Sequence, residues 1–154
     1  MKSYLSVTER KIRMAIVGCG RISKNHFGSI EKHQDNIELI SICDVQQDVL
    51  SEHEEKYNVK GYLDLGDMLE NEDLDLVVIC TPSGTHADQT ELCAKHGVNV
   101  MTEKPMATRW SDGVRMVKSC DNAGVRLFVV KQNRRNSTLQ LLKRAVKENR
   151  FGKI

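Results

Sequence analysis

Short apolar runs alternate with longer stretches of mixed polarity along the chain. The apolar runs predict buried strands, and the stretches between them predict helices with one apolar face. Six strands are expected, at residues 12–17, 37–43, 59–63, 74–80, 98–101 and 125–130. Helices are expected at residues 48–57, 65–71, 85–96, 111–122 and 136–149, with a further one ending near residue 33. The alternation is typical of an α/β fold with a doubly wound parallel sheet.

A glycine turn lies between the first expected strand and the first expected helix. It has the form G-x-G-x-x-S, with Gly18, Gly20 and Ser23 at the defined positions. The first glycine permits a tight turn, and the second lets a dinucleotide diphosphate approach the backbone. The free N–H groups of the following helix favour a phosphate at the same place. The turn therefore predicts dinucleotide binding on a Rossmann fold.

An acidic residue follows the second expected strand at the position that this fold uses for ribose. Asp44 comes 24 residues after Gly20, where a carboxylate accepts hydrogen bonds from the adenosine ribose hydroxyls. A carboxylate there repels a 2′-phosphate, and the neighbouring Val45 and Gln46 carry no positive charge. The sequence favours NAD over NADP. Taken alone, Asp44 is equally explained as a cap of the next helix.

The length of 154 residues is sufficient for one domain of this kind. We expect an N-terminal extension at residues 1–11 and a dinucleotide-binding domain at residues 12–150. Residues 151–154 are expected to be the start of a second domain that the chain lacks. Leu139, Leu142 and Val146 recur at helical spacing near the end, and we expect this stripe to pack the last helix on the sheet.

Two further segments follow the fourth and fifth expected strands, at the sheet edge where open α/β sheets bind ligands. The first is Thr81-Pro82-Ser83-Gly84-Thr85-His86, and the second is Glu103-Lys104-Pro105. Lys104 is placed to act on a substrate hydroxyl, with burial lowering its basicity and Glu103 holding it in place. Both segments also fit a plainer interpretation. The first is then a strand-to-helix turn with a hydrogen-bonded histidine, and the second a solvated Glu-Lys pair.

Composition and charge narrow the class of protein. Hydrophobic residues make up 40% of the chain and charged residues 29%, which excludes collagenous and low-complexity proteins. No apolar run has the roughly 18 residues of a membrane span, and the first ten residues have no apolar stretch of the kind found in signal peptides, so we expect neither a membrane span nor secretion. The five cysteines are widely spaced and form no C-x-x-C pair. They therefore predict reduced thiols in the cytoplasm and no metal site.

These motifs together resemble the Gfo/Idh/MocA oxidoreductase family. The resemblance rests on GCGRIS after the first strand, Asp44 after the second, CTPSGTH after the fourth, MTEKP after the fifth and a final FGKI. It covers residues 11–154. Through residues 129–146, with the sequence VVKQNRRNSTLQLLKRAV, the chain further resembles the family's UDP-N-acetylglucosaminuronic acid 3-dehydrogenases, which serve bacterial surface-polysaccharide (lipopolysaccharide) biosynthesis.

The resemblance implies a role for each motif. NAD(P) is carried on this domain, and a sugar or polyol on a second domain that also assembles the oligomer. The residues implied in cofactor binding are Gly18, Gly20, Arg21, Ile22, Asp44, Thr81, Pro82, His86, Glu103, Lys104 and Gln132. Lys104 is also the implied catalytic residue, assisting proton transfer during hydride transfer. Arg134 or Arg135 could face a uronate carboxylate or a diphosphate.

Three alternatives remain open at this point. The chain could be a non-catalytic NAD-binding or redox-sensing module, or a dehydrogenase of another sugar or a polyol such as inositol. The basic stretch at residues 131–153, with eight basic residues against one acidic residue, could also bind nucleic acid. The apolar stripe of the last helix argues against that third alternative. Because we expect the chain to lack the second domain, we also expect it to bind NAD and to oxidise no sugar by itself.

Overall fold

The apolar runs form the strands of a single sheet, because a parallel strand covered on both faces needs apolar side chains on both. The structure, a computed structural model, describes residues 7–153. Residues 1–6 of the expected N-terminal extension, and Ile154 at the expected start of a second domain, lie outside the described residues. The strands are β1 (Ile12–Val17), β2 (Ile37–Cys43), β3 (Lys60–Tyr62), β4 (Leu76–Ile79), β5 (Asn99–Thr102) and β6 (Leu127–Val129).

The sheet is parallel throughout and has the strand order β3-β2-β1-β4-β5-β6. This order confirms the predicted doubly wound fold, with its switch point between β1 and β4. The helices are α1 (Ser23–Lys32), α2 (Gln47–Tyr57), α3 (Leu65–Asn71), α4 (His86–Lys95), α5 (Trp110–Ala123) and α6 (Ser137–Lys147). A short 3-10 helix, η1 (Gln132–Arg135), was not predicted from the sequence.

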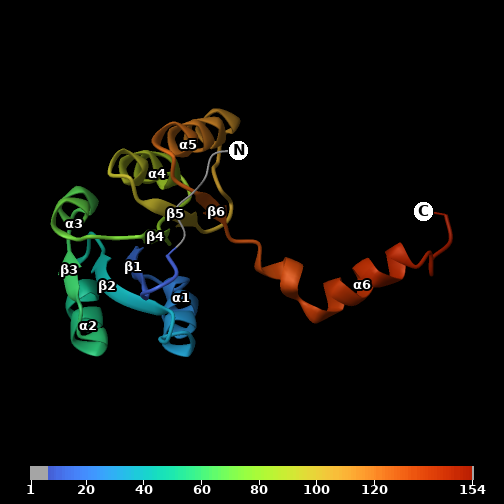
Figure 1. Cartoon of the computed structure of the whole chain (residues 1–154), viewed down its shortest axis with the longest axis horizontal. Coiled ribbons are helices and arrows are strands. Elements are labelled where there is room, and N and C mark those ends of the chain that lie inside the picture. The colour runs from blue at the N-terminus through green and yellow to red at the C-terminus, as the bar shows by residue number, and fades with distance from the viewer. Residues whose placement is uncertain (1–6, 154) are drawn as a thin grey trace.

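Two cores lie on opposite faces of the sheet because successive side chains of a strand alternate in direction. Ile16 of β1 packs with Phe27 of α1 and Leu50 of α2 on one face. Val17, the next residue, packs with Met68 of α3 on the other face. In Figure 1, α1 and α2 cover one side of the sheet, and α3, α4 and α5 cover the other.

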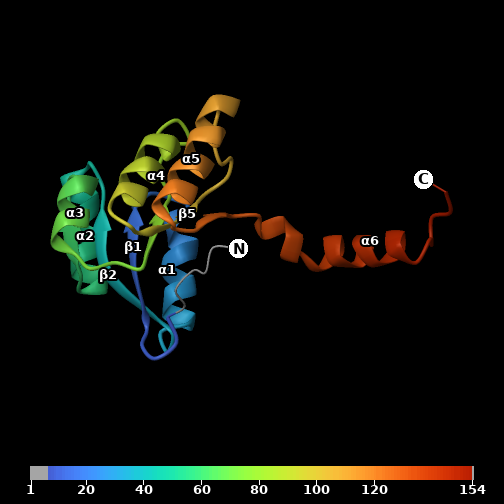
Figure 2. The same cartoon turned by 45° about the horizontal axis from the view of Figure 1, so that its top comes forward.

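The last helix, α6, was expected to pack on the sheet, and this expectation was wrong. Leu139, Leu142 and Val146 are 43%, 48% and 45% exposed, and α6 projects away from the layers in both views (Figures 1 and 2). In a parallel sheet, a helix packs on the sheet when the strand that follows it pairs with another strand of the same sheet. Within the described residues, no strand follows α6. No helix in residues 7–153 combines the length and apolar character that crossing a membrane requires.

All five cysteines are free and buried. Burial raises the pKa of four of them to about 12 and that of Cys120 to about 11, from an ordinary value of 9.0. For Cys19, the nearby carboxylate of Asp44 adds to this effect. The folded protein therefore keeps these thiols protonated in the pH range where an unfolded chain begins to ionise them.

We expect the free energy of unfolding to fall as the pH rises above 9, because only the unfolded chain then ionises its thiols. With an ordinary thiol pKa of 9.0 in the unfolded chain, the expected loss at pH 9.5 is about 0.8 kcal/mol for each thiol. Urea denaturation at about pH 7.5 and about pH 9.5 measures it. The variant Cys93→Ala, which has one thiol fewer, should show a smaller decline. Equal unfolding free energies at the two pH values would contradict the burial of these groups.

Candidate functional site

The glycine turn lies at the switch point of the sheet, directly after β1. The N–H of Gly18 donates to the carbonyl oxygen of Cys43, at 2.8 Å. Gly18 has a φ of +86°, and a Cβ built on it would lie 2.9 Å from the carbonyl carbon of Cys80 and from the nitrogen of Thr81. Such close backbone contact leaves room for glycine only. The end of β1 is thereby held tightly between the ends of β2 and β4.

Gly20 has a different environment, because a Cβ built on it would meet no atom within 4 Å. The open side of the turn is therefore free for a ligand to approach the backbone. The hydroxyl of Ser23, which is fully buried, donates to the carbonyl oxygen of Gly20 at 2.6 Å. The first turn of α1 follows, and no side chain caps it. Its N–H groups therefore remain available to an anion.

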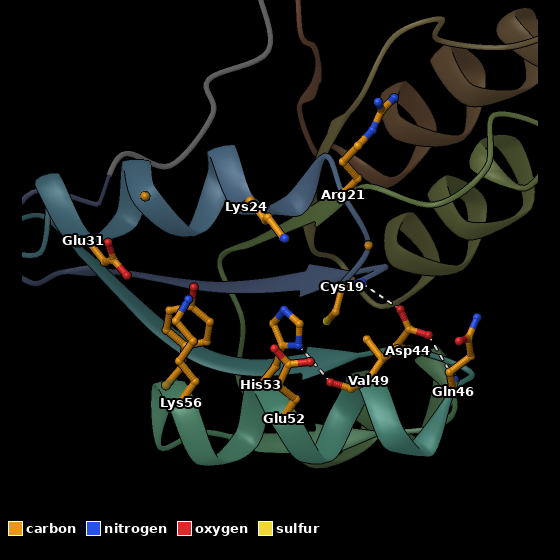
Figure 3. Close-up of a pocket in the computed structure, with 13 residues that line it drawn as sticks. Cys19, Arg21, Lys24, Glu31, Asp44, Gln46, Val49, Glu52, His53 and Lys56 are labelled. Atoms are coloured by element: carbon orange, nitrogen blue, oxygen red, sulfur yellow. Dashed lines mark hydrogen bonds between the residues drawn. The ribbon is translucent and has the colours of Figure 1, made fainter.

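Asp44 connects the glycine turn to the start of α2. One carboxylate oxygen accepts a hydrogen bond from the backbone N–H of Cys19, at 2.7 Å. The other accepts from the N–H of Gln46, at 3.0 Å (Figure 3). A carboxylate has about four acceptor positions, so two remain for a ligand. Asp44 lies at the turn and supports the local backbone, but it does not cap α2, whose N-cap is Gln46 and has no side-chain cap hydrogen bond.

A cavity of about 580 Å³ extends from this turn along the groove between α1 and α2. Figure 3 shows Lys24 and Glu31 on α1 opposite His53 and Lys56 on α2. No motif in the sequence points to these four residues. Lys24 and Glu31 are seven residues apart and His53 and Lys56 are three apart, so each pair lies on one face of its helix. That spacing indicates a shared face, but only the folded structure shows that the two faces oppose each other.

His86 joins the segment after β4 to the segment after β5. Its side chain is 1% exposed, and its Nε2 lies 2.9 Å from the carbonyl oxygen of Thr81. Its Nδ1 lies 3.1 Å from the carbonyl oxygen of Pro105. Thr85 does not cap α4 with its side chain, and its hydroxyl donates instead to the carbonyl oxygen of Pro82. Any effect of His86 on a ligand must act through the two segments that it joins.

Glu103 and Lys104 have opposite environments. Glu103 is 7% exposed, and its carboxylate lies 2.8 Å from Nε2 of His26 on α1 and accepts the backbone N–H of Lys104 at 3.1 Å. Lys104 is exposed, and its ammonium has no ion-pair partner within residues 7–153. The expectation that Lys104 is buried was therefore wrong, and Glu103 holds this residue through its backbone N–H and not through its ammonium. The carboxylate of Glu103 contacts α1, and Lys104 is exposed.

Gln132 lies in η1, on the exposed segment that leads from β6 to α6. Arg134 and Arg135 lie in the same short helix and are also exposed. The structure brings the other predicted positions together at the carboxyl ends of β1, β2, β4 and β5. Gln132 follows the carboxyl end of β6, the strand that pairs with β5. Among residues 7–153, no group of three His, Cys, Asp or Glu side chains is arranged to hold a metal ion.

Comparison with known proteins identifies relatives of this fold. Residues 12–131 match the model of GFO_IDH_MocA, an oxidoreductase family with an NAD-binding Rossmann fold. The chain is 31% identical to a D-apiose dehydrogenase of Paraburkholderia graminis over 97% of its length, and 34% identical to a myo-inositol 2-dehydrogenase of Thermotoga maritima over 92%. It spans only 40% and 42% of the length of these relatives.

Two solved structures are more similar. The WlbA dehydrogenase of Chromobacterium violaceum, in complex with NADH and UDP-GlcNAcA, is 55% identical, with a TM-score of 0.94 over 99% of this chain. The WlbA dehydrogenase of Bordetella pertussis, with the same two ligands, is 54% identical, with a TM-score of 0.93 over 97%. This chain covers 44% and 43% of those two chains.

The two glycines of the turn should respond differently to replacement by alanine. Gly18→Ala should lower the free energy of unfolding by about 2 kcal/mol or more, because of its positive φ and its contact with backbone. Gly20→Ala should change it by no more than about 0.5 kcal/mol, because its Cβ enters open space. Urea denaturation of both variants makes the comparison. Equal losses would contradict this geometry of the turn.

Proposed function

Because the chain belongs to the GFO_IDH_MocA family of oxidoreductases, which have an NAD-binding Rossmann fold, we propose that it binds NAD at the glycine turn. We further propose that it is the cofactor-binding part of a dehydrogenase that oxidises a nucleotide sugar. The observation that carries the proposal is the pairing of an open glycine turn with Asp44 at the switch point of the sheet. Open α/β sheets bind dinucleotides at this place.

The residues of the turn fit the diphosphate of a dinucleotide. The open side of Gly20 accommodates the phosphates against bare backbone, and the uncapped N–H groups at the start of α1 donate to them. Arg21 adds a positive charge beside the turn, and Ile22 continues the backbone into the helix. Gly18 contributes indirectly, by allowing the turn to lie against the end of β4.

Asp44 fits the adenosine ribose. Its two remaining acceptor positions suit two vicinal hydroxyl donors, and its charge disfavours a 2′-phosphate. Arg21 and Lys24 line the same cavity as Asp44. The site therefore contains positive charges, although the residues next to Asp44 in the sequence, Val45 and Gln46, carry none. The hydrogen bond from Cys19 fixes the carboxylate at the turn. For this reason we propose NAD rather than NADP as the cofactor.

The segments after β4 and β5 fit the nicotinamide end. Thr81 and Pro82 form one side, held by the ring of His86, and Glu103 and Lys104 form the other. NAD, when bound, supplies the nicotinamide carbon that accepts a hydride. The free ammonium of Lys104 is available to hold a substrate hydroxyl and to assist its loss of a proton. Lys104 is the catalytic residue of this proposal.

The proposed substrate is UDP-N-acetylglucosaminuronic acid, oxidised at the C3 hydroxyl. The support is the 55% identity to a dehydrogenase solved with NADH and UDP-GlcNAcA, which exceeds the identity to the polyol and pentose dehydrogenases. A guanidinium of Arg134 or Arg135 suits a carboxylate or diphosphate oxygen. An inositol or another sugar is the second candidate, favoured by the 34% identity to the myo-inositol enzyme.

We also propose how the domains of the whole protein are organised. Residues 12–150 would form the cofactor domain, and the further length of the relatives would supply a second domain with most of the sugar contacts and the oligomer interface. This division accounts for the exposed apolar side of α6, which begins after the family match ends at residue 131. The five free thiols suit a reducing compartment, and we propose a cytoplasmic location.

Calorimetric titration tests the cofactor site. We expect NADH to bind more tightly than NADPH, and Asp44→Ala to weaken NADH binding by about 1–3 kcal/mol, because ribose hydroxyls lose their acceptor. Asp44→Asn should narrow the difference between the two cofactors because the charge is removed. The control is Asp48→Ala, which removes an exposed carboxylate one turn along, in α2. NADPH binding as tightly as NADH would contradict the proposed role of Asp44.

The proposed division of labour predicts a protein that binds cofactor without turnover. The 154-residue chain, mixed with NAD and UDP-N-acetylglucosaminuronic acid, should form no NADH above the blank, because the relatives' additional length would hold the sugar. Absorbance at the NADH band measures turnover, and NADH binding in the same preparation shows that the chain is folded. Steady NADH formation would contradict this division.

A further inference from the structure

His26 contacts the carboxylate of Glu103, although no sequence motif pointed to this histidine. It lies on α1 one turn after Ser23, and its side chain is 14% exposed. Its Nε2 is 2.8 Å from one oxygen of Glu103, while the other oxygen of Glu103 accepts the backbone N–H of Lys104. We infer that His26 is a positioning residue, which holds the Glu103–Lys104 segment in place for the nicotinamide end of the cofactor. This inference rests on the proposed function.

The need for a partner follows from the burial of Glu103. Its side chain is 9% exposed, and a buried carboxylate without a hydrogen-bond donor is strongly unfavourable. An ionised carboxylate only accepts hydrogen bonds, so the contact requires a proton on Nε2 of His26. Without that donor, the carboxylate would have to turn toward solvent. Its hydrogen bond with the N–H of Lys104 would then break, and the lysine would lose its orientation.

The position of His26 on α1 connects the two ends of the site. Near the start of the helix, Ser23 binds the carbonyl oxygen of Gly20 in the glycine turn, at 2.6 Å. One turn later, His26 binds Glu103, which also receives support from β4 because its N–H donates to the carbonyl oxygen of Ile79 at 3.0 Å. The same rigid helix therefore fixes the diphosphate end through Ser23 and the nicotinamide end through His26.

Comparing two ligands separates this positioning role from a general structural one. NADH spans the whole proposed site, whereas ADP has the adenosine and diphosphate but lacks the nicotinamide and its ribose. Calorimetry on the 154-residue chain should show His26→Ala binding NADH about tenfold more weakly. The affinity for ADP should stay within about twofold, because the glycine turn and Asp44 are untouched.

Three further variants complete the test. His26→Gln retains an N–H donor at similar reach and should recover most of the NADH affinity. Glu103→Gln removes the charge and should reproduce the selective loss of NADH affinity. His33→Ala is the control, because it removes an exposed imidazole just past the end of the same helix, and it should leave both affinities unchanged. Thermal unfolding of each variant shows which are folded.

The possible outcomes separate a failure of the positioning role from a failure of the proposed function. An equal loss of NADH and ADP affinity in His26→Ala, or no loss at all, would overturn the positioning role while leaving the cofactor site intact. If His26→Ala does not fold, Glu103→Gln decides, and a variant that binds NADH normally would overturn the inference. If the unaltered chain binds neither NADH nor ADP, the proposed function itself fails, and the inference fails with it.

Discussion

The close approach of the glycine turn to the end of β4 is the constraint on which the site depends. Gly18 lies so near the backbone of Cys80 and Thr81 that no side chain fits there, and Asp44 holds the next residue from the β2 side. Three strand ends are thereby brought together around bare backbone. The start of α1, the carboxylate of Asp44 and the segments after β4 and β5 take their positions from this junction, and so does the place where a dinucleotide would lie.

The sequence was sufficient for those features that depend on local pattern. Buried parallel strands are continuously apolar, so residues 12–17 and 37–43 were predicted with the bounds that the structure shows. The glycine turn was identifiable because a positive φ and close backbone contact leave glycine as the one suitable residue at position 18. Asp44 was identifiable from its place at the end of a strand. In each case, the feature depends on a few residues that are close together in the sequence.

Features that depend on distant partners could not be predicted in the same way. Glu103 pairs with His26, which is 77 positions away, so the sequence near Lys104 indicated neither this partner nor the exposure of the lysine. The ring of His86 joins two segments whose contact exists only after folding. The stripe of Leu139, Leu142 and Val146 correctly indicated a helix. An apolar stripe indicates that one face of a helix is to be covered, but it does not indicate by which element. In this structure the sheet does not cover it.

The central claim is that residues 18–20 and Asp44 together form a dinucleotide site. The most direct test is a crystal structure of the chain grown with NADH. We expect the diphosphate to lie against the backbone of Gly20 and the first turn of α1, with the adenosine ribose hydroxyls bonded to the carboxylate of Asp44. A dinucleotide bound elsewhere on the protein, with the glycine turn bare and Asp44 contacting no ribose, would contradict it.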